Sequence, residues 1–251
     1  MKKQKKFGSI NVIVCDTYEE VSSVAAEIVA DEIKKKPDFV LGLATGSSPI
    51  GLYTKLAEKN KAGEIDFSNV KTFNLDEYYP IDPSNDQSYR YFMNKNLFNK
   101  VNIKLENTRV PDGTAEDTDK FCESYEADIK AAGGVDLQVL GIGNNGHIGF
   151  NEPCDKFYKI THVVELTENT IEANSRFFES ADLVPRKAIT MGVGTIMNAK
   201  KIVLVANGAN KAQALYGALC GDVTPHNQAS VLQYHKDVTI IVDKEAASLL
   251  K

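Results

Sequence analysis

The sequence predicts an α/β protein built on a mostly parallel sheet that is covered by helices on both faces. Two observations lead to this class. Short apolar segments of strand length alternate along the chain with longer segments of helical periodicity. In addition, glycine-rich or acidic loops directly follow several of the apolar segments, as loops do at the carboxyl ends of parallel strands.

The expected strands are short apolar runs, and most of them are bounded by polar or turn-forming residues. Residues 137–140, for example, read Leu-Gln-Val-Leu and lead straight into a glycine-rich loop. Such runs are typical of strands that are buried on both faces. In chain order, strands are predicted over 11–15, 39–43, 70–74, 137–140, 161–165, 188–191, 202–206 and 238–242.

The expected helices have recognisable start and stop signals. Thr17 and Glu20 have the spacing of a capping box, and Pro37 ends the helix that they begin. Ser48 is predicted to be the N-cap of the next helix, with Pro49 in its first turn, and Thr167 is predicted to cap a later one. In chain order, helices are predicted over 17–36, 49–60, 88–98, 118–132, 167–176, 211–220 and 245–250, and the stretch 77–87 is expected to be an irregular loop.

Composition is that of an ordinary globular protein. The 251 residues are 43% hydrophobic and 25% charged, and they contain neither a repeat nor a low-complexity linker, so residues 1–251 are expected to form a single domain. The net charge of −5 makes nucleic acid an unexpected partner, and the lysines within residues 2–6 are interpreted as a solvated terminus.

Location is inferred from two further features. The sequence contains neither a signal peptide nor a stretch near the ~20 apolar residues that span a bilayer, so no membrane association is expected. The four cysteines are scattered and form no C-x-x-C motif. Reduced thiols in a cytoplasmic protein without a metal site are therefore expected.

The strongest functional signal is the loop G-I-G-N-N-G-H-I-G-F-N-E-P at residues 141–153. Its four glycines allow a close approach of backbone to ligand, and it carries an imidazole, His147, together with a carboxylate, Glu152. A tight turn with an incidental histidine is the alternative. Two further loops at predicted strand ends favour a catalytic site instead.

One of these loops lies between the predicted strand 39–43 and the following helix, and the other follows strand 70–74. The first could bind an anion at a helix N-terminus, or it could be a plain capping turn; it lacks the Gly-Lys-Ser/Thr of a Walker A loop. The second begins at Asn74 and contains Asp76, which could be a general base or, alternatively, an N-cap or turn carboxylate. The candidate anion-binding residues of the first loop are Thr45, Gly46, Ser47 and Ser48.

Two basic residues, Arg176 and Lys211, could complete a phosphate site. For either residue taken alone, a solvated surface charge is the favoured interpretation. Together with the 45–48 loop they form a plausible anion clamp. The pattern by itself therefore indicates a phosphorylated small molecule and proton transfer beside a carbonyl, such as aldose–ketose isomerisation, with no dinucleotide fingerprint in the chain.

Four motifs resemble the glucosamine-6-phosphate deaminase family from about residue 11 to the end of the chain. They are F-N-L-D-E-Y at 73–78, G-I-G-N-N-G-H-I-G-F-N-E-P at 141–153, A-N-S-R-F-F at 173–178 and M-G-V-G-T at 191–195. The related 6-phosphogluconolactonases share the G-H but continue toward T-A-S-L-F-P. The resemblance implies a modified doubly wound, Rossmann-like fold, and the conversion of glucosamine 6-phosphate and water to fructose 6-phosphate and ammonia without a cofactor.

The resemblance also assigns roles to individual residues. Asp76 matches the base that moves a proton from C2 to C1, and His147 matches the group that opens the pyranose ring. Glu152 matches the carboxylate that orients this histidine. Asn145 stands where some members have aspartate, so it is assigned a positioning role. The phosphate is assigned to Arg176, Lys211 and the 45–48 loop, in which Ser47 replaces a common glycine.

Two alternatives are a 6-phosphogluconolactonase-type hydrolase and a non-catalytic sugar-phosphate sensor. The presence of both Asp76 and His147 argues against the sensor. Allosteric members bind an activator phosphate through a serine, an arginine and a lysine–threonine pair that follow N-E-P. This chain has Asp155, His162, Val164 and Glu165 at those positions. We therefore expect a non-allosteric monomer or small homo-oligomer.

Overall fold

Within residues 3–175, 178 and 180–250, which the computed structural model describes, the strands form two sheets. The main sheet has the order β1-β2-β11-β10-β7-β3-β4-β6, and only the β1–β2 pair is antiparallel. The predicted α/β class with a mostly parallel sheet is confirmed. Its strands are β1 Lys3–Phe7, β2 Ile10–Cys15, β3 Val40–Leu43, β4 Lys71–Asn74, β6 Thr108–Arg109, β7 Leu137–Leu140, β10 Lys201–Ala206 and β11 Val238–Asp243.

Strand β1 is a feature that sequence analysis missed, because three of its five residues are lysines. It pairs with β2 at the edge of the main sheet, and the Nζ of Lys5 donates to the carbonyl of Leu250. Lysines along an edge strand oppose pairing with another chain. The basic terminus is therefore a charged sheet edge rather than a solvated tail.

A second, smaller sheet is antiparallel and has the order β5-β9-β8. The predicted strands 161–165 and 188–191 are confirmed as strands, but they belong to this sheet. The stretch 77–87 is not wholly irregular, since its first residues extend β5. The strands are β5 Asp76–Tyr79, β8 His162–Glu165 and β9 Lys187–Thr190.

The helices follow the predicted order with three corrections. The five-residue helix α6 Val193–Met197 was not predicted. Helix α2 has Pro49 at its N-cap position, and the hydroxyl of Ser48 donates to Asn207 instead of capping the helix. The segment 245–250 forms turns, because so short a stretch gains few helical hydrogen bonds. The helices are α1 Tyr18–Lys35, α2 Ile50–Lys61, α3 Tyr89–Asn96, α4 Thr118–Ala131, α5 Glu168–Ser175, α6 Val193–Met197 and α7 Ala212–Cys220, with short 3₁₀ turns at Phe98–Lys100, Leu105–Asn107, Ala181–Leu183, Ala209–Lys211 and Gln228–Tyr234.

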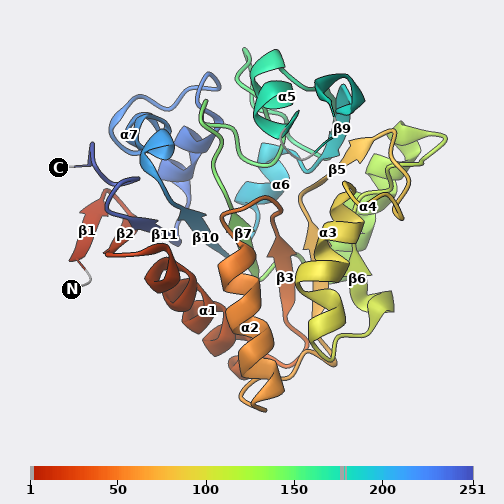
Figure 1. Ribbon diagram of the computed structural model, residues 1–251, viewed down its shortest axis with the longest axis horizontal. Helices are drawn as coiled ribbons and strands as arrows, with labels where there is room; N and C mark the ends of the chain where they lie inside the picture. Colours follow the sequence, from red (N-terminus) through yellow and green to blue (C-terminus); the bar gives the residue numbers. More distant parts are fainter. Residues whose placement is uncertain (1–2, 176–177, 179, 251) are drawn as a thin grey trace.

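Helices cover the main sheet on both faces. Helices α1, α2 and α3 lie in front of it in the view of Figure 1, where α1 packs along α2. After β6 the strand order runs back across the sheet, so right-handed crossovers place α4, α6 and α7 on the opposite face. Every residue of the central strands β3 and β7 is consequently buried. No helix in the described residues is long and apolar enough to cross a membrane.

The order of strands reverses between β3 and β7. From β3 the chain continues outward to β4 and β6, and from β7 it continues in the other direction to β10 and β11. Loops that leave two such strands at their carboxyl ends diverge and open a crevice, which is where open α/β sheets bind ligands. The loops in question are 44–49 and 141–147, the two glycine-containing loops that sequence analysis selected.

Candidate active site

A cavity of about 320 Å³ lies at this crevice and is lined by most of the predicted site residues. They come from the loop after β3 (Thr45, Gly46, Ser47 and Ser48), the start of β5 (Asp76), the loop after β7 (His147) and the turn before α7 (Lys211). Asn145 and Glu152 do not line the cavity; they contact His147 from behind. Arg176 lies outside the described residues.

The neighbouring carboxylates Asp76 and Glu77 have separate environments. Glu77 accepts hydrogen bonds from the N–H groups of Tyr89 (2.8 Å) and Arg90 (2.9 Å), and so satisfies the N-terminus of α3. The carboxylate of Asp76 accepts no hydrogen bond from the described residues, and the residue borders the cavity. The residue pattern left open whether Asp76 is a base or an N-cap or turn carboxylate. Of the two neighbours, Glu77 is the one that bonds a helix N-terminus.

Burial raises the pKa of the Asp76 carboxyl. Only 5% of the residue is exposed, and burial, with a smaller contribution from the charge of Glu77, raises the pKa of its carboxyl to about 8. Gly149 keeps this side accessible, because a β-carbon there would lie 3.4 Å from the Asp76 Oδ2 and 2.9 Å from the hydroxyl of Thr190. An uncompensated carboxylate in this position is a strong proton acceptor once it is ionised.

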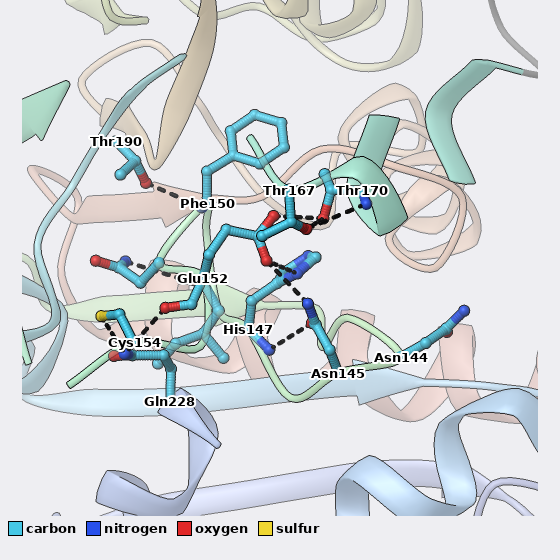
Figure 2. A network of polar contacts seen from close by, with 12 residues as sticks. Asn144, Asn145, His147, Phe150, Glu152, Cys154, Thr167, Thr170, Thr190 and Gln228 are labelled. Atoms are coloured by element: carbon cyan, nitrogen blue, oxygen red, sulfur yellow. Dashed lines mark hydrogen bonds and ion pairs between the residues drawn. The ribbon is translucent and has the colours of Figure 1, made fainter. Parts of the chain in front are cut away.

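His147 lies between the cavity and a buried carboxylate. Its Nδ1 is 3.4 Å from the Glu152 Oε2, an ion-pair distance that is longer than a well-formed hydrogen bond. The side-chain amide of Asn145 donates to the same Oε2 (2.9 Å), and its Oδ1 accepts from the backbone N–H of His147 (3.2 Å). Figure 2 shows this arrangement, with Asn145 bridging the backbone N–H of His147 and the carboxylate of Glu152. The structure therefore brings together all three residues of the predicted triad.

Glu152 is held as an anion. Burial alone would raise the pKa of its carboxyl, but hydrogen bonding and charge from His147, together with donors from Thr170 and Asn145, lower it to about 2. The hydroxyl of Thr170 on α5 donates to Oε1 (Figure 2). The backbone carbonyl of Glu152 accepts from the buried side-chain amide of Gln228 (3.2 Å). Asn145, Thr170 and Gln228 together hold Glu152 in place beside the imidazole.

The 45–48 loop has the properties of an anion cradle. The main-chain N–H groups of its four residues find no hydrogen-bond acceptor in the described part of the chain, and the loop lines the cavity just before α2. Gly46 has a φ of +95°, which favours glycine. Lys211 reaches the same cavity, and its Nζ lies 2.8 Å from the Oδ1 of Asn144.

Several lining residues were not predicted from the sequence, among them Tyr89, Asn144, Thr170, Asn174 and Asn210. Asn144 and Asn174 lie within the motifs at 141–153 and 173–178. Their position in these motifs could have identified them as site residues. Tyr89 had no such signal. It enters the cavity wall through its packing on Phe150, with ring centroids 5.8 Å apart.

The donor set does not form a metal centre within residues 3–175, 178 and 180–250, since these contain no group of three or more His, Cys, Asp or Glu side chains that could hold an ion. The site thus consists of a buried carboxylate, an imidazole beside a second carboxylate, and a loop whose N–H groups face a cavity.

Known proteins resemble this chain in sequence and in overall fold. Residues 16–241 match the family model described as glucosamine-6-phosphate isomerases/6-phosphogluconolactonase. The glucosamine-6-phosphate deaminase of Clostridioides difficile (strain 630) is 58% identical over 241 residues, which cover 96% of this chain and 97% of that protein. A solved structure of a monomeric glucosamine-6-phosphate deaminase superposes with a TM-score of 0.93 at 46% identity, covering 95% of this chain and 99% of the other.

The likeness to the lactonases is more remote. The 6-phosphogluconolactonase from Trypanosoma cruzi has a TM-score of 0.77 at 22% identity, over 99% of both chains, and this likeness concerns the fold alone. The match to the family model, the identity to curated relatives and the agreement in fold lead to one conclusion: the chain belongs to the glucosamine-6-phosphate isomerase/6-phosphogluconolactonase family.

Proposed function

We propose that this protein is a glucosamine-6-phosphate deaminase of amino-sugar catabolism, which converts glucosamine 6-phosphate and water to fructose 6-phosphate and ammonia. The observation that carries the proposal is the single cavity that joins an uncompensated Asp76 carboxylate, the His147–Glu152 pair and a loop of N–H groups without protein acceptors. The relatives of highest identity described above bear the same name.

Each chemical step has a group suited to it. His147 moves a proton from the anomeric hydroxyl to the ring oxygen and so opens the pyranose, with Glu152 and Asn145 orienting the ring of the histidine. Asp76 then takes the C2 proton and returns it to C1, which converts the amino aldehyde to a 2-imine. Water adds to the imine, and ammonia leaves. These proton transfers need only acid–base groups, so the proposal includes no cofactor.

The phosphate is assigned to the opposite wall of the cavity. The N–H groups of residues 45–48 and the ammonium of Lys211 face the same space, and Arg176 is proposed to join them. Oriented N–H groups and cations bind phosphate through charge-assisted hydrogen bonds. A phosphate held there places the other end of the sugar toward Asp76 and His147.

Further properties belong to the same proposal. We infer one domain over residues 1–251, because the main hydrophobic core includes residues from Ile10 to Leu250. We infer a cytoplasmic protein without nucleic-acid or membrane partners from the charge and the scattered cysteines. We also infer a monomer or small homo-oligomer, a state consistent with the monomeric deaminase of similar structure.

The deciding experiment measures ammonia release from glucosamine 6-phosphate by the wild type and by Asp76→Asn. Release by the wild type and its loss in the variant support the proposal. Hydrolysis of 6-phosphogluconolactone without ammonia release would favour the lactonase alternative. Tight binding of glucosamine 6-phosphate without turnover would favour a sensor.

A further inference from the structure

The hydrogen bonding around the phosphate loop divides its backbone N–H groups into two sets. The groups of residues 45–48 find no acceptor in the described chain. By contrast, the N–H groups of Ala44, just before the loop, and of Gly51, in the first turn of α2, each donate to a tyrosine hydroxyl. The loop is therefore anchored at both ends and open only in its middle, where the cavity lies.

The first anchor is the hydroxyl of Tyr53, on the first turn of α2. It donates to the carbonyl of Ala44 and accepts from the N–H of the same residue (3.2 Å). Tyr53 is fully buried, so these backbone groups have no water to replace a lost partner. One hydroxyl thus fixes the peptide groups on both sides of the Ala44 α-carbon, immediately before Thr45.

The second anchor is the hydroxyl of Tyr18, at the start of α1. It lies 3.1 Å from the carbonyls of both Ser47 and Ser48, to which it donates, and it accepts from the N–H of Gly51 (2.8 Å). Gly51 permits this approach of α1 to α2, since a β-carbon there would lie 2.1 Å from the hydroxyl of Ser22. Because the carbonyls of Ser47 and Ser48 point toward Tyr18, the N–H groups of the loop remain available on the side of the cavity.

From this geometry we infer that Tyr18 and Tyr53 are positioning residues for phosphate binding: their hydroxyls hold the 44–48 loop in the conformation that presents its N–H groups to the substrate phosphate. The inference rests on the proposed function, because that function identifies the substrate. The binding of phosphate to the loop does not depend on it. Tyr18 belongs to a helix that supplies no residue to the cavity wall, so the sequence motifs of the site do not include it.

The test compares Tyr18→Phe, Tyr53→Phe and the wild type by two measurements: steady-state kinetics with glucosamine 6-phosphate, and the Kd for inorganic phosphate from calorimetry on the full chain. Loss of a hydrogen bond that orders the loop should weaken phosphate binding by about 3- to 10-fold. The KM and the phosphate Kd should rise together, while kcat stays within about twofold of the wild type, because the phosphate is remote from the reacting carbons.

Asp136→Asn serves as a control for general destabilisation. Its carboxylate is buried at the amino ends of β3 and β7, where it accepts from Lys36 (2.6 Å) and Lys200 (2.7 Å), far along the strands from the cavity. This variant should melt at a lower temperature yet bind phosphate as the wild type does. If Tyr53→Phe fails to fold, the comparison of Tyr18→Phe with the wild type still tests the inference, because Tyr18 is only half-buried.

The inference would be overturned if the tyrosine variants that fold bind phosphate with the Kd of the wild type. It would also be overturned if Asp136→Asn raises the phosphate Kd as much as the tyrosine variants do. A wild type that binds phosphate but releases no ammonia would refute the proposed function, while the comparison of phosphate affinities would still decide the role of the tyrosines.

Discussion

Two adjacent carboxylates, Asp76 and Glu77, illustrate how neighbouring residues in a strand acquire different tasks. Alternating side chains point to opposite faces, so one meets the cavity and the other meets the N-terminus of α3. Glu77 gains hydrogen bonds from backbone N–H groups, and burial nevertheless raises the pKa of its carboxyl to about 7. The carboxyl of Asp76 is buried and accepts no hydrogen bond from the described residues. Its raised proton affinity suits a general base.

The elevated pKa of Asp76 predicts a pH dependence of activity. The carboxyl is protonated below its pKa of about 8, so the kcat/KM for glucosamine 6-phosphate should rise as pH increases through that value. Asp76→Asn should lower kcat by about 10²- to 10⁴-fold, the range attributed to a positioned general base. Unchanged exchange of the C2 proton into solvent in the variant would contradict the assignment, and the exposed Asp222→Asn serves as the control.

The same shift predicts a pH dependence of stability. An unfolded aspartate loses its proton near pH 4, whereas the folded Asp76 retains it until about pH 8, so the free energy of unfolding falls as pH rises across this interval. Asp76→Asn removes this term. The melting temperature of the variant relative to the wild type should therefore increase from pH 5 to pH 8, and a difference that stays constant over this range would rule out a raised pKa in the folded protein.

The His147 site allows ring opening to be separated from the C2 step. His147→Gln should slow turnover of the pyranose, because glutamine cannot shuttle the proton between the anomeric hydroxyl and the ring oxygen. A substrate analogue held in the open-chain form should be affected much less, since its C2 proton is taken by Asp76. Equal loss on both substrates would contradict this division of roles. His226→Gln, with 68% of its side chain exposed, is the matched control.

At the scale of elements, the strands and long helices were predictable because burial sets the hydrophobic pattern directly. Strand 137–140 was predicted with its observed bounds, and the long helix α1 was predicted from its capping residues and from Pro37. Strand β1 was not, because a charged edge strand has no apolar alternation to detect. Assignment of β8 and β9 to a separate sheet depends on long-range pairing, which local patterns do not contain.

The site was predictable where its residues stand in loops after buried strands, and less so where it depends on packing. Asp76, His147 and the 45–48 loop meet because they follow β4, β7 and β3, which are neighbours in the main sheet at the reversal of strand order and next to it. The donor Thr170 and the aromatic wall at Tyr89 come from helices that fold over the cavity from elsewhere. Their contribution follows from tertiary contacts alone.

Lys211, in the turn between β10 and α7, allows the proposed phosphate site to be tested. Lys211 is the last residue of this turn, beside Asn144 from the loop after β7. Lys211→Ala should raise the KM by about tenfold or more with a much smaller effect on kcat, since charge-assisted contacts contribute about 1.5–3 kcal/mol and this one is remote from C1 and C2. Kinetics in parallel with the exposed Lys187→Ala provide the comparison. An unchanged KM would remove Lys211 from the phosphate site.

At the scale of the whole molecule, the region after N-E-P bears on regulation. Asp155 is exposed and its carboxylate lies 3.8 Å from the Nε2 of His226. His162 stacks on Tyr158 with ring centroids 4.0 Å apart, and burial lowers the pKa of its imidazole, which keeps it neutral near pH 7. An anionic effector would thus meet a carboxylate and an uncharged ring where allosteric members offer hydrogen-bond donors and cations.

We therefore predict that N-acetylglucosamine 6-phosphate does not activate this protein. An effector shifts a conformational equilibrium only by binding one state more tightly than another, and the carboxylates of Asp155 and Glu165 oppose the binding of its phosphate. Rate against glucosamine 6-phosphate concentration should be hyperbolic with and without the effector, and the protein should sediment as a monomer or small oligomer under assay conditions. A sigmoidal curve that the effector makes hyperbolic would show that an anion site exists despite these residues. Repeating the measurement with Asp155→Ser would then show whether position 155 contributes to that site.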